Sequence, residues 1–140
     1  MKIRFLIYGL GGWCLEIFWT GLGSLLSGDM TLPGRTSIWM FLIYGLAVFI
    51  EPIHEKLRGR SVFIRGGVYA LTIYFIEFTT GLTLKLLLGT CPWSYSGIPL
   101  SIYGIITLSY LPVWFLTGLL FERTHDLLLQ LKKIRPAAQS

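Results

Sequence analysis

Residues 62–89 read VFIRGGVYALTIYFIEFTTGLTLKLLLG, an apolar run that exceeds the roughly 20 residues needed to cross a lipid bilayer as a helix. Similar runs cover about residues 4–26, 36–56 and 101–122. The chain of 140 residues is 54% hydrophobic and 14% charged, with a mean hydropathy of +0.66, which is too apolar for a soluble domain. The sequence therefore predicts an all-α integral membrane protein, built as an up-down bundle of four transmembrane helices.

Basic residues predict how these helices cross the membrane. Lys and Arg cluster at the two termini and between the second and third runs, and only Arg35 and Lys85 of the 12 lie near the opposite face. By the positive-inside rule, both termini are cytoplasmic and the connections 27–35 and 90–100 lie outside. We expect the plasma membrane, which in a bacterium is the inner membrane. Because the charges flank apolar runs, the lipid bilayer is the expected partner and nucleic acid is not.

Short connections predict that consecutive helices are antiparallel neighbours within a single membrane domain, residues 1–140. Pro52 and Pro112 lie inside the second and fourth runs, where the missing backbone hydrogen bond should bend each helix. In the C-terminal tail, residues 123–140, leucines recur at helical spacing. This pattern predicts an amphipathic helix lying on the cytoplasmic membrane surface.

Two carboxylates lie near the middle of apolar runs. Glu16 and Glu77 are each roughly 15–22 Å from the cytoplasmic end of their helices, at about 1.5 Å per residue, so the two can meet. A carboxylate at that depth costs at least a few kcal/mol. Three states are open: protonated carboxyls bonded to hydroxyl groups, two carboxylates sharing a proton, or carboxylates holding an imported cation. The candidate ion or solute site comprises Glu16, Glu77, Tyr8, Tyr44, Tyr74 and Thr80.

Two Glu-x-x-His pairs stand at the predicted cytoplasmic ends of the second and fourth helices. Glu51 and His54 form one pair, and Glu122 and His125 form the other. With one Glu from each remaining helix, these residue types match a di-iron carboxylate bundle. The pairs lie on the order of 10 Å below the mid-membrane carboxylates, however, which exceeds the reach of a metal–ligand bond. Whether these four residues bind a metal, and which one, stays open.

The alternative for this level of the membrane is ordinary charge pairing. Acidic side chains there would pair with nearby Arg and Lys at the membrane surface, and these acids are Glu51, Glu55, Glu122 and Asp126. Other chemistry is absent from the sequence, which has no G-x-x-x-x-G-K-[ST] motif, no CxxC pair and no recognisable nucleophile arrangement.

Several motifs follow one another in order over about residues 4–122. They are YGLGGWCLE (8–16), LPGRTSIWMFLIYG (32–45), YFIEFTTG (74–81), CPWSYS (91–96) and YGIITLSYLPVW (103–114). In this combination, the chain resembles the transmembrane protein 229 family and the related bacterial ABC-transporter permease family of the CmpB type. The resemblance implies a fold and a topology more than an activity.

The resemblance also implies motif positions, which are Glu16, Glu51, Glu77, Trp93 and Tyr95. Ser94 departs from the family pattern, which has Asp there, so a role that needs a carboxylate in this connection is not expected. Taken from the residues alone, Trp93 and Tyr95 either anchor helix ends at the lipid headgroups or form a lid that faces a solute.

The leading hypothesis is a small permease-like protein that binds or moves a cation or small solute at the mid-membrane carboxylates. We expect no cofactor, although a bound cation is open, and a homodimer or a separate ATPase subunit as partner. The first alternative is a non-catalytic lipid-binding or scaffold protein. The second is a metal-dependent membrane enzyme that acts at the cytoplasmic rim through the Glu-x-x-His pairs.

Overall fold

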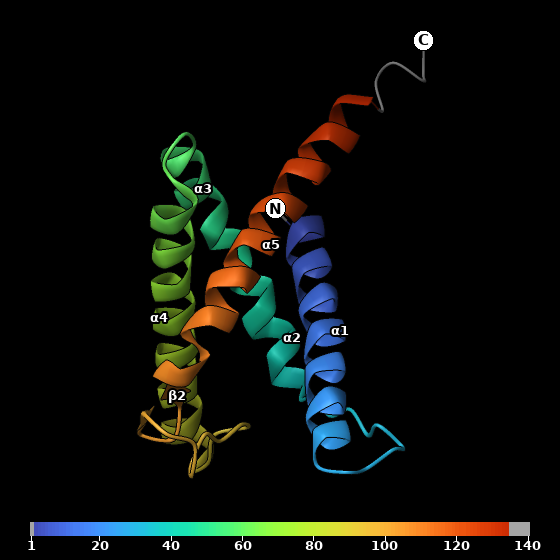
Figure 1. Cartoon of the computed structure of the whole chain (residues 1–140). Helices are drawn as coiled ribbons and strands as arrows, with labels where there is room; N and C mark the ends of the chain where they lie inside the picture. Colours follow the sequence, from blue (N-terminus) through green and yellow to red (C-terminus); the bar gives the residue numbers. More distant parts are fainter. Residues whose placement is uncertain (1, 135–140) are drawn as a thin grey trace. The chain divides into compact units, whose positions relative to one another are not determined.

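A computed structural model describes residues 2–134 of the chain, which are mostly helical and include one small hairpin (Figure 1). The elements, in chain order, are α1 (Lys2–Leu26), α2 (Ile38–Gly45), the 3-10 helix η1 (Leu46–Ile50), α3 (Glu51–Leu57), α4 (Val62–Leu88), β1 (Ser101–Ile102), β2 (Ile106–Thr107), the 3-10 helix η2 (Leu108–Tyr110) and α5 (Leu111–Ile134).

The chain divides into two compact units. The first contains the residues up to Val48 together with Thr80–Trp93, and the second contains Phe49–Thr79 together with the residues from Ser94 on. The single membrane domain expected from the sequence stays a prediction.

Among the described residues, three helical segments are long and apolar enough to cross a membrane. They are Lys2–Leu26, Ile38–Leu57 and Val62–Leu88, within two residues of the first three predicted runs. The all-helical membrane character is thus confirmed. The four-span bundle and its orientation stay predictions, as does the cytoplasmic placement of the tail, whose residues 135–140 lie outside the described part.

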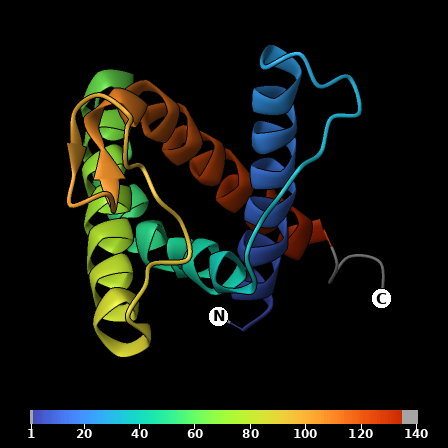
Figure 2. The ribbon, with the colours of Figure 1, turned by 90° about the horizontal axis from the view of Figure 1, so that it is seen from below.

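The predicted fourth run begins differently from the expectation. Residues 101–107 form an antiparallel hairpin in which Ser101 pairs with Thr107, and Tyr103 and Gly104 turn the chain at φ values of 54° and 69°. The hairpin lies beside α4 (Figures 1 and 2), where the Tyr74 hydroxyl donates to the Thr107 carbonyl at 2.9 Å. The helix therefore starts at Leu111 instead of about residue 101, and it continues to Ile134.

Both prolines are the second residue of an α-helix. Pro52 follows Glu51 in α3, directly after the 3-10 segment η1, and a bend of the second run at this residue stays a prediction. Pro112 was predicted to bend the interior of a helix, and that prediction is wrong, because it is the second residue of α5. The backbone N–H groups of a first helical turn have no partner within the helix, so a proline there removes no helical hydrogen bond.

In the first unit, α1 and α2 lie side by side and run antiparallel (Figure 1). Residues later in α2 contact residues earlier in α1. The Trp13 indole donates to the Ser37 carbonyl at 2.8 Å, just before α2. Further along α2, Phe41 packs against Gly9, and Gly45 packs against Phe5. A side chain at either glycine would overlap the facing ring. Small residues thus permit the close approach of these helices.

In the second unit, α4 and α5 pack through the same kind of contact. Tyr69 on α4 is fully buried, and a side chain added at Gly118 on α5 would overlap it. Gly66 on α4 similarly faces the ring of Phe115 on α5. This packing brings the polar side chains on the inner faces of α4 and α5 within hydrogen-bond distance.

Candidate functional site

Glu77 is buried in the second unit and is held by a tyrosine from the connection that follows α4. Only 4% of its surface is exposed, although it sits in an apolar helix. The Tyr95 hydroxyl donates to Glu77 Oε1 at 2.6 Å, and the Tyr95 ring makes an edge contact with Tyr110. A motif position implied by the family resemblance therefore contacts Glu77, the carboxylate predicted to lie at mid-membrane depth.

The other residues predicted for the mid-membrane site are distributed between the two units. Tyr74 lies in the second unit, where its hydroxyl donates to the Thr107 carbonyl. Tyr8, Tyr44 and Thr80 belong to the first unit, where Tyr8 is buried and Tyr44 packs against Gly12. A single site formed by all six candidate residues stays a prediction.

Glu16 belongs to the first unit, on α1, and is half-buried. Its carboxyl group forms a hydrogen bond with the Thr36 side chain. Among the described residues, the other oxygen, Oε2, is buried and has no hydrogen-bond partner. The first unit therefore holds its own polar carboxyl between α1 and the segment that precedes α2.

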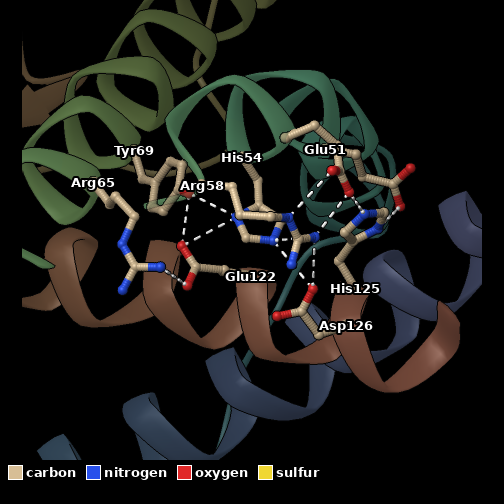
Figure 3. A network of polar contacts seen from close by, with 9 residues as sticks. Glu51, His54, Arg58, Arg65, Tyr69, Glu122, His125 and Asp126 are labelled. Carbon is tan, nitrogen blue, oxygen red and sulfur yellow. Dashed lines mark hydrogen bonds and ion pairs between the residues drawn. The ribbon is translucent and has the colours of Figure 1, made fainter. Parts of the chain in front are cut away.

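A network of polar side chains lies in the second unit, where α3, α4 and α5 contribute to it (Figure 3). We call it the histidine–carboxylate cluster. It comprises Glu51, His54, Glu55, Arg58, Arg65, Tyr69, Glu122, His125 and Asp126. The cluster contains both Glu-x-x-His pairs of the sequence, so the structure brings together the four residues proposed for the cytoplasmic rim.

His54 is buried at the centre of this cluster. Its Nδ1 lies 3.1 Å from the Tyr69 hydroxyl and 3.3 Å from Glu122 Oε2, and its Nε2 lies 3.1 Å from Asp126 Oδ1. The imidazole of His54, on α3, thus contacts side chains of both α4 and α5.

His125 is buried on α5 and reaches back to α3. Its Nε2 lies 3.1 Å from Glu55 Oε1. Its Nδ1 lies 3.2 Å from Glu51 Oε1, an ion-pair distance without hydrogen-bond alignment. Each histidine therefore contacts acidic residues of the other Glu-x-x-His segment or its neighbours.

Two arginines complete the cluster. Arg65 on α4 donates to Glu122 Oε1 at 2.7 Å. Arg58, just after α3, places Nη2 3.0 Å from Glu55 Oε1 and 3.1 Å from Asp126 Oδ1. The predicted pairing of Glu55, Glu122 and Asp126 with nearby arginines is thus confirmed.

The charges around Asp126 keep it ionised. Burial raises the pKa of Asp126, but the hydrogen bonds from His54 and Arg58 outweigh burial and leave this pKa below its ordinary value. Conversely, the hydrogen bonds to Glu55 and Asp126 raise the pKa of the Arg58 guanidinium above its ordinary value. At neutral pH, both groups of this contact therefore carry their charge.

A metal ion at the Glu-x-x-His pairs would need several side chains to converge on one point. Among residues 2–134, no group of three His, Cys, Asp or Glu side chains is arranged to hold a metal ion. The ring nitrogens instead lie 3.1–3.3 Å from acidic or hydroxyl oxygens. The four residues are therefore ion-pair and hydrogen-bond partners here.

Sequence reasoning missed Tyr69 and Arg65 as members of this site. Both lie on α4, four residues apart, so they share one face of the helix. That spacing was a signal that could have linked them, because an Arg and a Tyr one turn apart in an apolar run can both reach one partner on a facing helix. The partner, Glu122, becomes evident only from the packing of α4 against α5.

Comparison with known protein families supports part of the resemblance. The model of the CmpB family, described as "Putative ABC-transporter type IV", matches residues 3–138, nearly the whole chain. The resemblance to this family is confirmed, whereas that to the transmembrane protein 229 family stays a prediction. No solved structure matches the chain.

Proposed function

Because the chain belongs to the ABC-transporter type IV family, we propose that it is a permease-like membrane protein that binds or moves a cation or small polar solute. The proposed binding residue is Glu77, and the proposed location is the plasma membrane. The family match and the three apolar helical segments among the described residues support an integral membrane protein.

The observation that carries the proposal is the burial of Glu77 with the Tyr95 hydroxyl 2.6 Å away. A carboxylate within a membrane segment costs at least a few kcal/mol, and such residues commonly mark ion or substrate pathways. A carboxylate has about four lone-pair positions, so it can bind a cation beside hydrogen-bond donors such as Tyr95. Tyr95 follows α4 in a connection, and displacing this connection would change access to Glu77.

Energy for transport would come from another subunit. The sequence has no G-x-x-x-x-G-K-[ST] motif, so the chain does not bind ATP by a P-loop. We therefore propose that a separate ATPase associates with the cytoplasmic side, in keeping with the family description. A homodimer is proposed as well, because the four predicted spans would enclose little volume.

The test is the thermal stability of the purified chain in nanodiscs, with and without Na⁺, K⁺, Mg²⁺, Mn²⁺ and Zn²⁺. The variants are Glu77→Gln and the control Asp29→Asn, which removes a carboxylate from the exposed connection after α1. A cation at about 100 times its Kd stabilises a one-site protein by about 2.7 kcal/mol. We expect one cation to stabilise wild type and Asp29→Asn but not Glu77→Gln.

Equal responses of wild type and Glu77→Gln to every cation would contradict the proposal. Glu77 would then be a buried structural carboxyl, and the lipid-binding or scaffold role would be favoured. Binding of a cation that persists in Glu77→Gln would move the site to another carboxylate.

A further inference from the structure

Helix α4 provides a scale of depth within the membrane. It runs from Val62 to Leu88, which is about 40 Å at 1.5 Å per residue, so it exceeds a hydrocarbon core of about 30 Å. Tyr74, Glu77 and Phe78 lie close to its midpoint. If α4 crosses the bilayer, side chains that contact these residues lie deep within it.

The chain that follows α4 returns to this midpoint. Residues 94–110, which include the hairpin, are joined to it by hydrogen bonds and a ring contact. These are the bonds from Tyr95 to Glu77 Oε1 at 2.6 Å and from Tyr74 to the Thr107 carbonyl at 2.9 Å, and the edge contact of Tyr103 with Phe78, with ring centroids 6.2 Å apart. The hairpin lies alongside α4 in both views (Figures 1 and 2). Residues 94–110 therefore lie at the level of the middle of the helix, not beyond its end.

The composition of this part of the chain suits the interior of a bilayer. No charged residue stands between Lys85 and Glu122. A charged side chain at bilayer depth is costly, so the absence of charge over this stretch permits its burial in the membrane. The exposed large hydrophobic side chains of the segment are Leu100, Ile102, Tyr103 and Leu108. Such a surface is more stable against hydrocarbon or other protein than against water.

The backbone of the segment has hydrogen-bond partners within the segment itself. Non-helical backbone is tolerated at membrane depth only where protein covers it or where it lines a water-filled cavity, because its polar groups need partners. The bonds are the Ser101–Thr107 ladder, the Tyr95 N–H to the Gly104 carbonyl at 2.9 Å, the Leu108 N–H to the Leu100 carbonyl at 3.2 Å, and the Thr107 and Ser109 hydroxyls to the Pro99 carbonyl at 2.8 Å each. Residues 105–107 are also buried. The segment therefore meets the requirement for a position within the bilayer.

Helix α5 continues the chain directly from this segment. Its charge-free part, residues 111–121, is shorter than the roughly 17 residues that a membrane-crossing helix needs. Among the described residues, the segments that are long and apolar enough to cross a membrane do not include α5. A helix with so short an apolar part fits a start inside the bilayer, where the hairpin ends.

We propose that residues 94–110 form a re-entrant segment, which enters the bilayer after α4, reaches its middle at the hairpin and there holds Tyr95 against Glu77. The connection expected to lie outside, residues 90–100, is then partly within the membrane, and α5 starts there as well. The depth of the segment depends only on α4 crossing the bilayer. The role of Tyr95 at a solute site rests on the function proposed above.

Tyr95 is the positioning residue in this arrangement. Its hydroxyl donates to Glu77 Oε1, which limits the rotation of the carboxyl group, and its ring makes an edge contact with Tyr110, just before α5. Membrane transporters commonly have their solute sites near the mid-plane, where helices are interrupted. The segment brings an interrupted chain, a hydroxyl donor and a carboxyl group to one depth. A movement of residues 94–110 would therefore change the bonding of Glu77.

The first test measures the depth of the segment by electron paramagnetic resonance of the full chain in liposomes. The background carries Cys14→Ser and Cys91→Ser, which remove both native thiols. Single cysteines replace Leu100 or Ile102, which are exposed, and carry a nitroxide label. Gd³⁺ chelated on lipid headgroups relaxes a nitroxide more strongly the closer it lies to the membrane surface. This dependence holds whether the label faces lipid, protein or water.

Matched labels on α4 calibrate the depth. Phe75 lies at the midpoint of α4, Leu88 is its last residue, and both are exposed, about 20 Å apart along the helix axis. We expect the labels at Leu100 and Ile102 to be relaxed about as weakly as the label at Phe75. A fourth helix that began at about residue 101, or a connection outside the membrane, would place both labels at the surface. Relaxation of either label closer to that of Leu88 would overturn the proposal, and Leu108→Cys replaces a variant that cannot be purified.

The second test follows the bond between Tyr95 and Glu77 by infrared spectroscopy of the full chain in nanodiscs. The difference between wild type and Glu77→Gln identifies the stretching band of the Glu77 carboxyl group. A change in hydrogen bonding shifts this band in either charge state. We expect Tyr95→Phe to shift it. The control Ser109→Ala removes a hydroxyl that bonds within the same segment and should leave the band unchanged.

An unshifted Glu77 band in Tyr95→Phe would overturn the positioning role of Tyr95. An equal shift in Ser109→Ala would do the same, because the band would then report the segment as a whole. Neither test adds a cation. Failure of cation binding at Glu77 and failure of the re-entrant arrangement are therefore seen in separate measurements.

Discussion

Replacing Arg65 with Met removes the cation that joins α4 to Glu122 on α5. The two side chains are 20% and 6% exposed, and Nη1 lies 2.7 Å from Oε1. Removing one partner of a buried ion pair costs about 3–5 kcal/mol, because the other charge stays buried. Glu122 retains the Tyr69 hydroxyl at 2.6 Å and His54 at 3.3 Å. We therefore expect a loss near the lower limit, about 3 kcal/mol in the free energy of unfolding.

The assay is denaturant unfolding in mixed micelles, followed by tryptophan fluorescence and carried out as a double-mutant cycle with Glu122→Gln. If the pair interacts directly, the double variant should lose about 1.5 kcal/mol less than the sum of the single losses, within the usual range for contacting residues. The control is Arg60→Met in the exposed connection after α3, which should change stability by less than about 0.5 kcal/mol. Equal losses for Arg65→Met and Arg60→Met, or strict additivity in the cycle, would refute the reasoning.

Three further changes test other contacts in the second unit. Gly118→Ala places a methyl group against the fully buried Tyr69 and should cost about 1–3 kcal/mol in unfolding experiments, so wild-type stability would contradict this packing. Tyr95→Phe removes the hydroxyl that donates to Glu77 and should cost about 1–3 kcal/mol by the same assay, and a neutral effect would show that the bond contributes nothing. The lowered pKa of Asp126 contributes stability that is complete above the ordinary aspartate pKa and is lost as pH falls through the lower folded-state value. The stability difference between wild type and Asp126→Asn should therefore shrink on acidification from pH 7 to about pH 3, and a constant difference would disprove this linkage.

Hydropathy was sufficient to predict the first three membrane segments to within two residues. Partition into a bilayer depends mainly on the side chains of one continuous segment, so no knowledge of distant contacts is needed. The same criterion misplaced the start of α5, because the apolar residues of the hairpin are as hydrophobic as those of a helix. Gly104 and Pro112 were local signals of a turn and a helix start within that run.

The Glu-x-x-His spacing was evident in the sequence, and so was the availability of arginines for the acidic residues. The predicted pairings of Glu55, Glu122 and Asp126 with arginine depended only on shared depth and opposite charge, and they are confirmed. The family implied that Tyr95 occupies a motif position, without indicating that its hydroxyl reaches Glu77.

Composition and local pattern thus sufficed for the membrane class, the helical segments and the inventory of ionisable side chains, because each is a property of one short segment. The pairing of His54 with Asp126, 72 residues away, required the fold. A hydrogen bond depends on distances of a few tenths of an ångström and on the rotation of each helix about its axis. Packing of Gly118 against Tyr69 fixes how α5 meets α4, and through Glu122 it helps to position the histidine–carboxylate cluster.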